Sequence, residues 1–205
     1  MGRDIGRLLE EMRDIQEQLE QFFDEARERF RYTLEGGRVR FSMEMQQLHL
    51  RYRVSSLRYL LDADLLSVLT APLVYLMIVP LVFLDAGLTL YQQTCFRAYG
   101  VPRVRRRDYL VNDRHKLGYL NTVEKINCTY CGYANGMVAY AREIVARTEQ
   151  YWCPIRHARR VSYAHLRYPK FFAYGDAASY QQGLAGKRGE LEHEVPAAGE
   201  EAEGT

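Results

Sequence analysis

Hydrophobic positions in residues 3–33 recur every three or four residues, which is the spacing of one face of an α-helix. This apolar stripe consists of Ile5, Leu8, Met12, Ile15, Leu19, Phe22, Ala26 and Phe30. A stripe this narrow is typical of a coiled-coil seam, so residues 5–30 either form a homo-oligomer or pack on their own chain. Gly36-Gly37 predicts the end of the helix.

Residues 38–62 fit two patterns. Alternation at Val39, Phe41, Met43 and Met45 is that of a strand, but Gln46-Gln47 would make a poor hairpin turn. The same region also has apolar residues at helical spacing and runs into the next segment without a breaker. We therefore predict a helix here, so that residues 1–62 form one amphipathic helical arm.

Residues Leu65 to Leu84 contain no charged residue. These 20 residues suffice for one crossing of a ~30 Å hydrocarbon core, and the apolar character continues beyond Asp85. We predict a membrane segment over 63–91, with a buried core helix as the alternative. Arginines flank both ends, which leaves open a single span or a re-entrant dip broken at Pro72 or Pro80.

Apolar residues from Leu117 to Tyr130 again have helical spacing, which predicts helices within 108–152. Asn112 or Asp113 could cap the first helix, and Gly132 to Gly136 predict a bend that returns the chain antiparallel. Residues 92–175 would form a basic helical domain. Residues 176–205 are rich in Gly, Ala and Glu and predict a disordered acidic tail. The expected fold class is all-α, a membrane-attached helical protein.

Charge is distributed unevenly along the chain. Residues 97–170 carry 15 Lys+Arg against 5 Asp+Glu, a net of +10, which favours an anionic neighbour. The candidate contacts are basic side chains and one aromatic ring: Arg103, Arg105, Arg106, Arg107, Trp152, Arg159 and Arg160. Because a membrane segment lies just upstream, this mixture favours the bilayer and its anionic headgroups over a nucleic acid.

Three of the four cysteines form a pattern typical of metal sites. Cys128 and Cys131 are a C-x-x-C pair followed by a glycine, and Cys153 precedes a proline. We predict that these three thiolates bind iron or zinc, with Cys95 as fourth ligand and His157 as its alternative. A redox or disulfide pair and ordinary core cysteines are the competing interpretations. The start of the chain has no apolar export signal, which favours reduced thiols.

The run from Cys128 to Tyr133, together with Cys153-Pro154, resembles the metal knuckle of rubredoxins. Arg156 stands where rubredoxins place a second cysteine, so the resemblance covers one knuckle only. The chain also resembles a family of uncharacterised bacterial membrane proteins, through the stretch from Asp113-Arg114-His115 to the run 146–154. We accordingly expect the bacterial inner membrane, with the main domain on the cytoplasmic face.

The sequence contains no Gly-rich phosphate loop and no G-x-S-x-G elbow, and nothing in it places a base beside a thiol. These observations favour a non-enzymatic role. The predicted function is a membrane-attached metal-binding protein, with iron for electron transfer to a redox partner or zinc as a structural ion. The alternative is a membrane scaffold or assembly factor without a metal.

Overall fold

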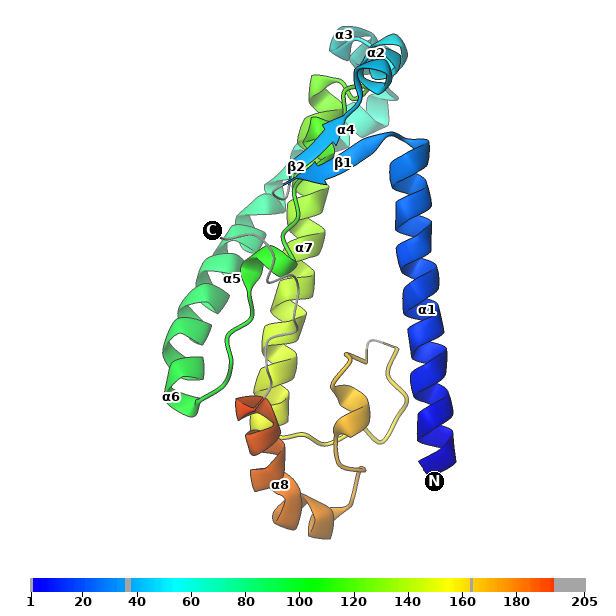
Figure 1. The fold of residues 1–205 in the computed structure, drawn as a ribbon. Helices are drawn as coiled ribbons and strands as arrows, with labels where there is room; N and C mark the ends of the chain where they lie inside the picture. The colour runs from blue at the N-terminus through cyan, green and yellow to red at the C-terminus, as the bar shows by residue number, and fades with distance from the viewer. Residues whose placement is uncertain (1, 36–37, 163, 194–205) are drawn as a thin grey trace. The chain divides into compact units, whose positions relative to one another are not determined.

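The structure, a computed structural model of the 205-residue chain, describes residues 2–35, 38–162 and 164–193, except for the side chains of residues 2–13, 16, 35 and 38. The described chain is mostly helical, as expected, and also contains one two-stranded hairpin (Figure 1). It divides into a first unit, Met1–Leu61 with Asp113–Lys125, and a second unit, Asp62–Asn112 with Ile126–Thr205.

The first unit begins with α1 (Gly2–Arg29), which confirms the predicted N-terminal helix. The side chains of Ile5, Leu8 and Met12, three of the eight residues of the predicted seam, lie outside the described ones. The helix ends before Arg31, which has a positive φ of 45°. The Gly36-Gly37 pair expected to end it lies outside the described residues.

Strands β1 (Tyr32–Glu35) and β2 (Arg38–Phe41) form an antiparallel hairpin, so the helical prediction for residues 38–41 was wrong. The register pairs Tyr32 with Phe41 and Leu34 with Val39. Because side chains alternate along a strand, these four apolar residues share one face of the hairpin. The pairing that forms this apolar face determines the structure here, although the local sequence alone has helical spacing.

Helices α2 (Met43–Tyr52) and α3 (Ser56–Leu61) follow and confirm the helical prediction for the rest of this segment. The hydroxyl of Ser42 caps α2 by accepting a hydrogen bond from the Met45 N–H at 3.3 Å. The unit is completed by Asp113–Lys125, with a short 3₁₀ turn, η3 (Arg114–Lys116).

Helix α7 (Thr122–Trp152) starts with a reciprocal capping box. The Asn121 side chain accepts from the Glu124 N–H at 3.0 Å, and the Glu124 carboxylate accepts from the Asn121 N–H at 2.9 Å. The predicted caps, Asn112 and Asp113, were therefore too early by about two turns of helix.

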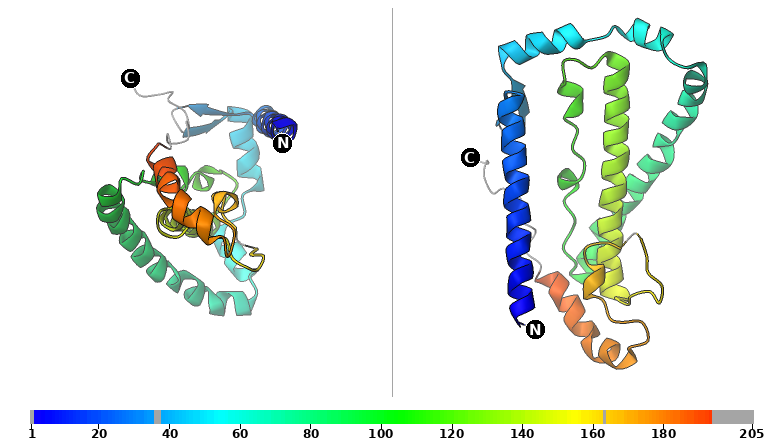
Figure 2. Two further views of the ribbon diagram at one scale, coloured as in Figure 1. Left: turned by 90° about the horizontal axis from the view of Figure 1, so that it is seen from below. Right: turned by 90° about the vertical axis from the view of Figure 1, so that its right-hand side faces the viewer.

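In the second unit, α4 (Leu65–Leu76) and α5 (Ile78–Tyr91) continue through a π turn, η1 (Gln92–Phe96), into α6 (Arg97–Tyr99). Together they form one helical path that curves gently (Figure 2). Pro72 lies inside α4 and Pro80 in the first turn of α5, where a missing N–H costs least. The chain reverses at neither proline.

After Gly100, residues 101–112 run back beside α7, with a 3₁₀ turn η2 (Arg106–Asp108) (Figures 1 and 2). The bend predicted at Gly132 to Gly136 does not occur, because α7 is continuous. Because these glycines have no side chain, the returning chain instead packs closely against α7 at this point. A Cβ on Gly136 would lie 2.5 Å from the Tyr109 carbonyl oxygen, and one on Gly132 would lie 3.6 Å from that of Val111.

The core of the second unit lies where the π turn, the returning chain and α7 meet. Its buried side chains are Phe96, Val101, Val104, Met137, Tyr140, Ile144 and Leu191. Leu191 belongs to α8 (Ala177–Glu192), so the disorder predicted for residues 176–205 was wrong for this helix. The amino-acid composition gave the wrong prediction because α8 is held by contacts with residues that are distant in the sequence. One of them is the hydrogen bond that Arg188 Nε–H donates to the Tyr151 carbonyl at 2.9 Å. Residues 194–205 lie outside the described ones.

Gly136→Ala tests the close approach of the returning chain. We expect a loss of about 1–3 kcal/mol in the free energy of unfolding, because the new methyl group must displace backbone atoms. The matched control is Gly186→Ala in α8, where nothing lies within 4 Å of the added Cβ. That change should stabilise by about 0.5–1 kcal/mol. Denaturant titration of both variants gives the comparison, and equal effects would contradict this packing.

Candidate functional site

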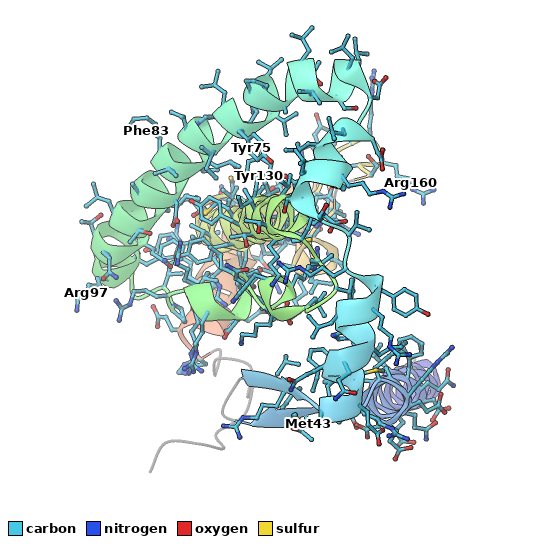
Figure 3. All side chains as sticks on the ribbon, turned by 90° about the horizontal axis from the view of Figure 1, so that it is seen from above. Met43, Tyr75, Phe83, Arg97, Tyr130 and Arg160 are labelled. Carbon is cyan, nitrogen blue, oxygen red and sulfur yellow. The ribbon has the colours of Figure 1, made fainter. Side chains whose placement is uncertain are left out.

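The apolar helix of the second unit has two chemically different faces. Its outward face carries Leu65, Leu69, Leu73 and Phe83, whose exposed fractions lie between 67% and 80%. The helix as a whole, Leu65–Tyr99, is long and apolar enough to cross a membrane, and none of its most apolar stretch is buried within the protein. Figure 3 shows Phe83 pointing away from the rest of the chain.

The inward face of this helix contacts α7 through hydroxyl and amide groups. Tyr75 bonds to Asn127, and the Tyr130 hydroxyl donates to the Val74 carbonyl at 2.8 Å. The rings of Tyr75 and Tyr130 meet edge to face, with centroids 5.7 Å apart (Figure 3). In both tyrosines the ring thus makes an apolar contact and the hydroxyl group is hydrogen-bonded.

Asp85 is the central polar contact of this face. Arg106 binds its carboxylate through two nitrogens, Nη2 at 2.6 Å and Nε at 3.3 Å, and the Tyr133 hydroxyl donates to it at 3.1 Å. The Asp85 side chain is only 15% exposed, whereas Arg106 is 51% exposed. One carboxylate therefore connects α5, the returning chain and α7.

About two helical turns further along, Gln92 makes a second connection of the same kind. Its amide nitrogen bonds to the Tyr140 hydroxyl, and its amide oxygen accepts the Val104 N–H at 3.1 Å. Gln92 is 4% exposed, so both polar atoms of its side chain are satisfied in the core. Tyr91 and Thr148 add a hydroxyl pair at 3.0 Å.

The structure does not bring the predicted metal ligands together. Cys128 and Cys131 lie near the start of α7, whereas Cys153 directly follows its last residue. A continuous helix separates Cys128 from Cys153 by about 37 Å at 1.5 Å per residue. Cys95 sits in the π turn, whose Gln92 bonds to Tyr140, a residue more than two helical turns beyond Cys131. The expected antiparallel return would have closed these distances, and it depended on the missing bend.

Among the described residues, no group of three His, Cys, Asp or Glu side chains is placed to hold a metal ion. All four thiols are unbridged, and those of Cys131 and Cys153 belong to exposed residues. Partial burial and the Glu149 carboxylate raise the pKa of Cys153, which disfavours the thiolate that a metal or a nucleophilic reaction needs.

Cys153 instead lines a pocket of about 400 Å³ at the end of α7, with Glu149, His157, His165 and Tyr168. His165 Nδ1 accepts the Arg167 N–H at 3.2 Å, so its proton lies on Nε2 and points at the Glu149 carboxylate, 3.0 Å away. The His157 ring stacks on Tyr168, which belongs to a 3₁₀ turn, η4 (Tyr168–Lys170). These contacts fix the loop after α7 onto the helix.

Glu143 anchors the same loop. The four-residue spacing of Glu143 and Arg147 predicts a helix-surface pair. The structure confirms the contact, at 2.8 Å, but the two side chains are only 17% and 13% exposed. Arg167 adds two more hydrogen bonds to the same carboxylate oxygen, at 2.7 and 3.0 Å. Burial raises the pKa of Glu143, but the hydrogen bonds from Arg167 and Arg147 outweigh it and hold that pKa below its usual value.

The predicted membrane-surface residues fall in two places. Arg103 bonds to Gln93 at 2.8 Å, Arg106 holds Asp85, and Arg105 and Arg107 are exposed on the same returning segment. Trp152 ends α7 against the ring of Tyr99, with centroids 5.3 Å apart. Arg159 and Arg160 are exposed in the loop after α7.

The most connected residues of this unit were missed at the level of sequence. In the sequence, Asp85 stands out only as an interruption of the apolar run, and Gln92 does not stand out at all. A lone carboxylate inside an apolar helix is a detectable signal, because it needs a partner wherever it is withdrawn from water. Nothing in the local sequence identifies Arg106 among the neighbouring arginines as that partner.

The separation of the cysteines gives the first test of the site. If four residues shared one ion, each single substitution would remove it. We expect instead that Cys95→Ser, Cys153→Ser and His157→Ala leave the metal content per protein unchanged, as measured by plasma mass spectrometry. The control is the Cys128→Ser/Cys131→Ser double variant. A loss of metal in all of these variants would show instead that the predicted ligands share one ion.

The Glu143 cluster predicts a pH-dependent stability. Since the folded-state pKa is lowered, this carboxylate contributes stability above its ordinary pKa and loses it as the pH falls through the lower folded value. Glu143→Gln should cost about 1.5–3 kcal/mol at pH 7 and less under acid conditions. Glu190→Gln on α8, whose side chain is 47% exposed, is the control and should change stability by less than ~0.5 kcal/mol.

Comparison with known proteins gives no match: no family model, no curated protein and no solved structure is similar to this chain. The geometry of the described residues is therefore what points to a function. The most informative part of that geometry is the two-faced apolar helix.

Proposed function

We propose that this protein is a non-enzymatic membrane scaffold, anchored by the helix Leu65–Tyr99 and presenting its first unit to a partner. The observation that carries the proposal is the outward face of that helix. Leucines and Phe83 are exposed along its length, although the chain has a buried core in the same unit. An apolar surface of this extent is unfavourable in water and marks a contact with lipid or protein.

The dimensions of the helix suit a bilayer. The uncharged run from Leu65 to Leu84 is about 30 Å long at 1.5 Å per residue, which equals the thickness of a hydrocarbon core. Asp64 precedes this run and caps α4, and Asp85 follows it. The first charges thus stand where the headgroup region would begin.

Residues beyond this boundary have interfacial chemistry. At the end of the apolar helix and of α7, the ring of Tyr99 stacks on Tyr151, and Trp152 meets both rings edge to face. Arg97, which Figure 3 shows pointing outward, and Arg103 lie close by in the chain. Aromatic rings and arginines are the residues that anchor proteins at a membrane surface. The net charge of +10 over residues 97–170 then favours the cytoplasmic face for this end of the helix, in the bacterial inner membrane that the sequence resemblance implies.

The polar inward face supports a scaffold rather than a lone anchor. Contacts at Asp85, Gln92 and Tyr75 tie the apolar helix to α7, so the membrane segment and the rest of the second unit move together. The side chains of the pocket at the end of α7 hold its loop in place. The iron or zinc site remains a prediction, and no convergent ligands support it among the described residues.

Membrane attachment is tested by extraction. Leu69→Arg/Leu73→Arg places two charges on the outward face, at a cost of about 2.5–3.5 kcal/mol each near a bilayer centre. We expect wild-type protein to resist alkaline carbonate and this variant to be released. The control is Leu57→Arg/Leu61→Arg in α3, where the residues are equally exposed at 69% and 76% but lie outside the segment. Full release of the wild type would overturn the proposal.

A further inference from the structure

The first unit contains an apolar groove of about 850 Å³. The apolar face of the β1–β2 hairpin forms its floor, with Tyr32, Leu34, Val39 and Phe41. Phe23 from α1, Phe30 just after that helix, and Leu48 from α2 line its sides. His49 joins the floor by edge-to-face contacts with Phe41 and Tyr119, at 4.8 and 5.1 Å.

This groove takes the place of a core. No apolar side chain among the described residues of the first unit is fully buried, and Phe30, Leu34 and Leu48 are 48%, 51% and 40% exposed. Two strands and three helices that bury so little apolar surface gain little stability from it. Something apolar that fills the groove would therefore complete the unit.

The groove also has a cationic edge. Arg27, Arg114 and Lys116 line it, against the single carboxylate of Asp113. Arg27 already pairs with Asp24 at 2.8 Å, so Arg114 and Lys116 are the main cations offered to an occupant. An occupant that fits this lining has an apolar face flanked by acidic groups.

The chain itself carries such a segment. Residues 14–25 of α1 contain five carboxylates, Asp14, Glu17, Glu20, Asp24 and Glu25, and no Lys or Arg. The apolar side chains of the same stretch are exposed, with Ile15 at 64%, Leu19 at 53% and Phe22 at 64%. We propose that residues 14–25 of one copy dock in the groove of a second copy.

Charge also argues against the simpler arrangement of two α1 helices side by side in register. That arrangement would place five carboxylates against five more, which disfavours pairing. Docking in the groove brings them to Arg114 and Lys116 instead. The two contacts are reciprocal, since each copy supplies one helix and one groove, and they close a two-fold dimer. The inference deepens the proposed scaffold function by naming the partner as a second copy.

Complementation between two variants tests this arrangement with the full chain in mild detergent. Ile15→Lys/Leu19→Lys removes the docking helix face, and Leu48→Lys removes the groove. Each variant alone should dimerise at least about tenfold more weakly, because a lysine must be desolvated at the contact. Mixed together they should associate again, since one intact helix meets one intact groove. Leu50→Lys is the control, because Leu50 is 62% exposed on α2 but does not line the groove.

A photo-crosslinking residue at position 15 gives a second measurement that does not depend on folding of the lysine variants. The expected crosslinks join it to residues 30–52 of another copy, and Arg114→Glu/Lys116→Glu should reduce their yield about tenfold. Crosslinks confined to α1 residues before the groove-lining Phe23, or lipid found in the groove, would overturn the proposal. So would dimerisation of the Leu48→Lys variant at wild-type strength. Carbonate extraction of the same variants separates this outcome from failure of the membrane anchor.

Discussion

The second unit depends on one carboxylate. Asp85 lies on a helix that is otherwise apolar, and its withdrawal from water is compensated by two nitrogens of Arg106 and the hydroxyl of Tyr133. Removal of either partner would leave a largely buried charge unsatisfied, which is among the most destabilising changes available to a protein. This one contact fixes the position of the returning chain. It therefore also fixes the side of α7, the one that bears Gly132 and Gly136, along which this chain runs.

The two units differ in how far they satisfy their own apolar surface. The second has a buried core around Met137, Tyr140 and Ile144, and leaves exposed mainly the outward face of one helix. The first leaves an open apolar groove beside a cationic edge. The exposed surfaces of the two units thus differ in chemistry. That of the second unit is a long apolar helix face, and that of the first unit is an apolar groove with a cationic edge. That difference suits a protein that joins a lipid phase to a protein partner.

Periodicity predicted much of the fold. The α1 helix, the helical nature of 43–61 and the apolar helix follow from patterns with a range of a few residues. The hairpin, the straight course of α7 and the order of α8 could not be predicted, because each depends on contacts between distant residues. The hairpin needs Tyr32 opposite Phe41, and α8 needs Leu191 in a core formed by residues 96–144.

The candidate site shows the same limit. Spacing identified Cys128 and Cys131 as neighbours, but it could not show that the glycines after them accommodate the chain of Tyr109 rather than bend the helix. The convergence of Cys153 on that pair depended entirely on this choice. Conversely, the pair Glu143–Arg147 was predictable because both residues lie on one helix, whereas Arg167 arrives from a loop.

Trp152 is the only tryptophan of the chain, and its ring lies 5.2 to 5.3 Å from those of Tyr151 and Tyr99, with the Arg188 guanidinium 6.0 Å away. The ends of α6, α7 and α8 therefore surround the only tryptophan. Its emission, excited at a wavelength that tyrosine does not absorb, reports on the meeting of these three ends. The molecule thus carries a built-in optical probe that can follow the melting of one unit while the other is changed.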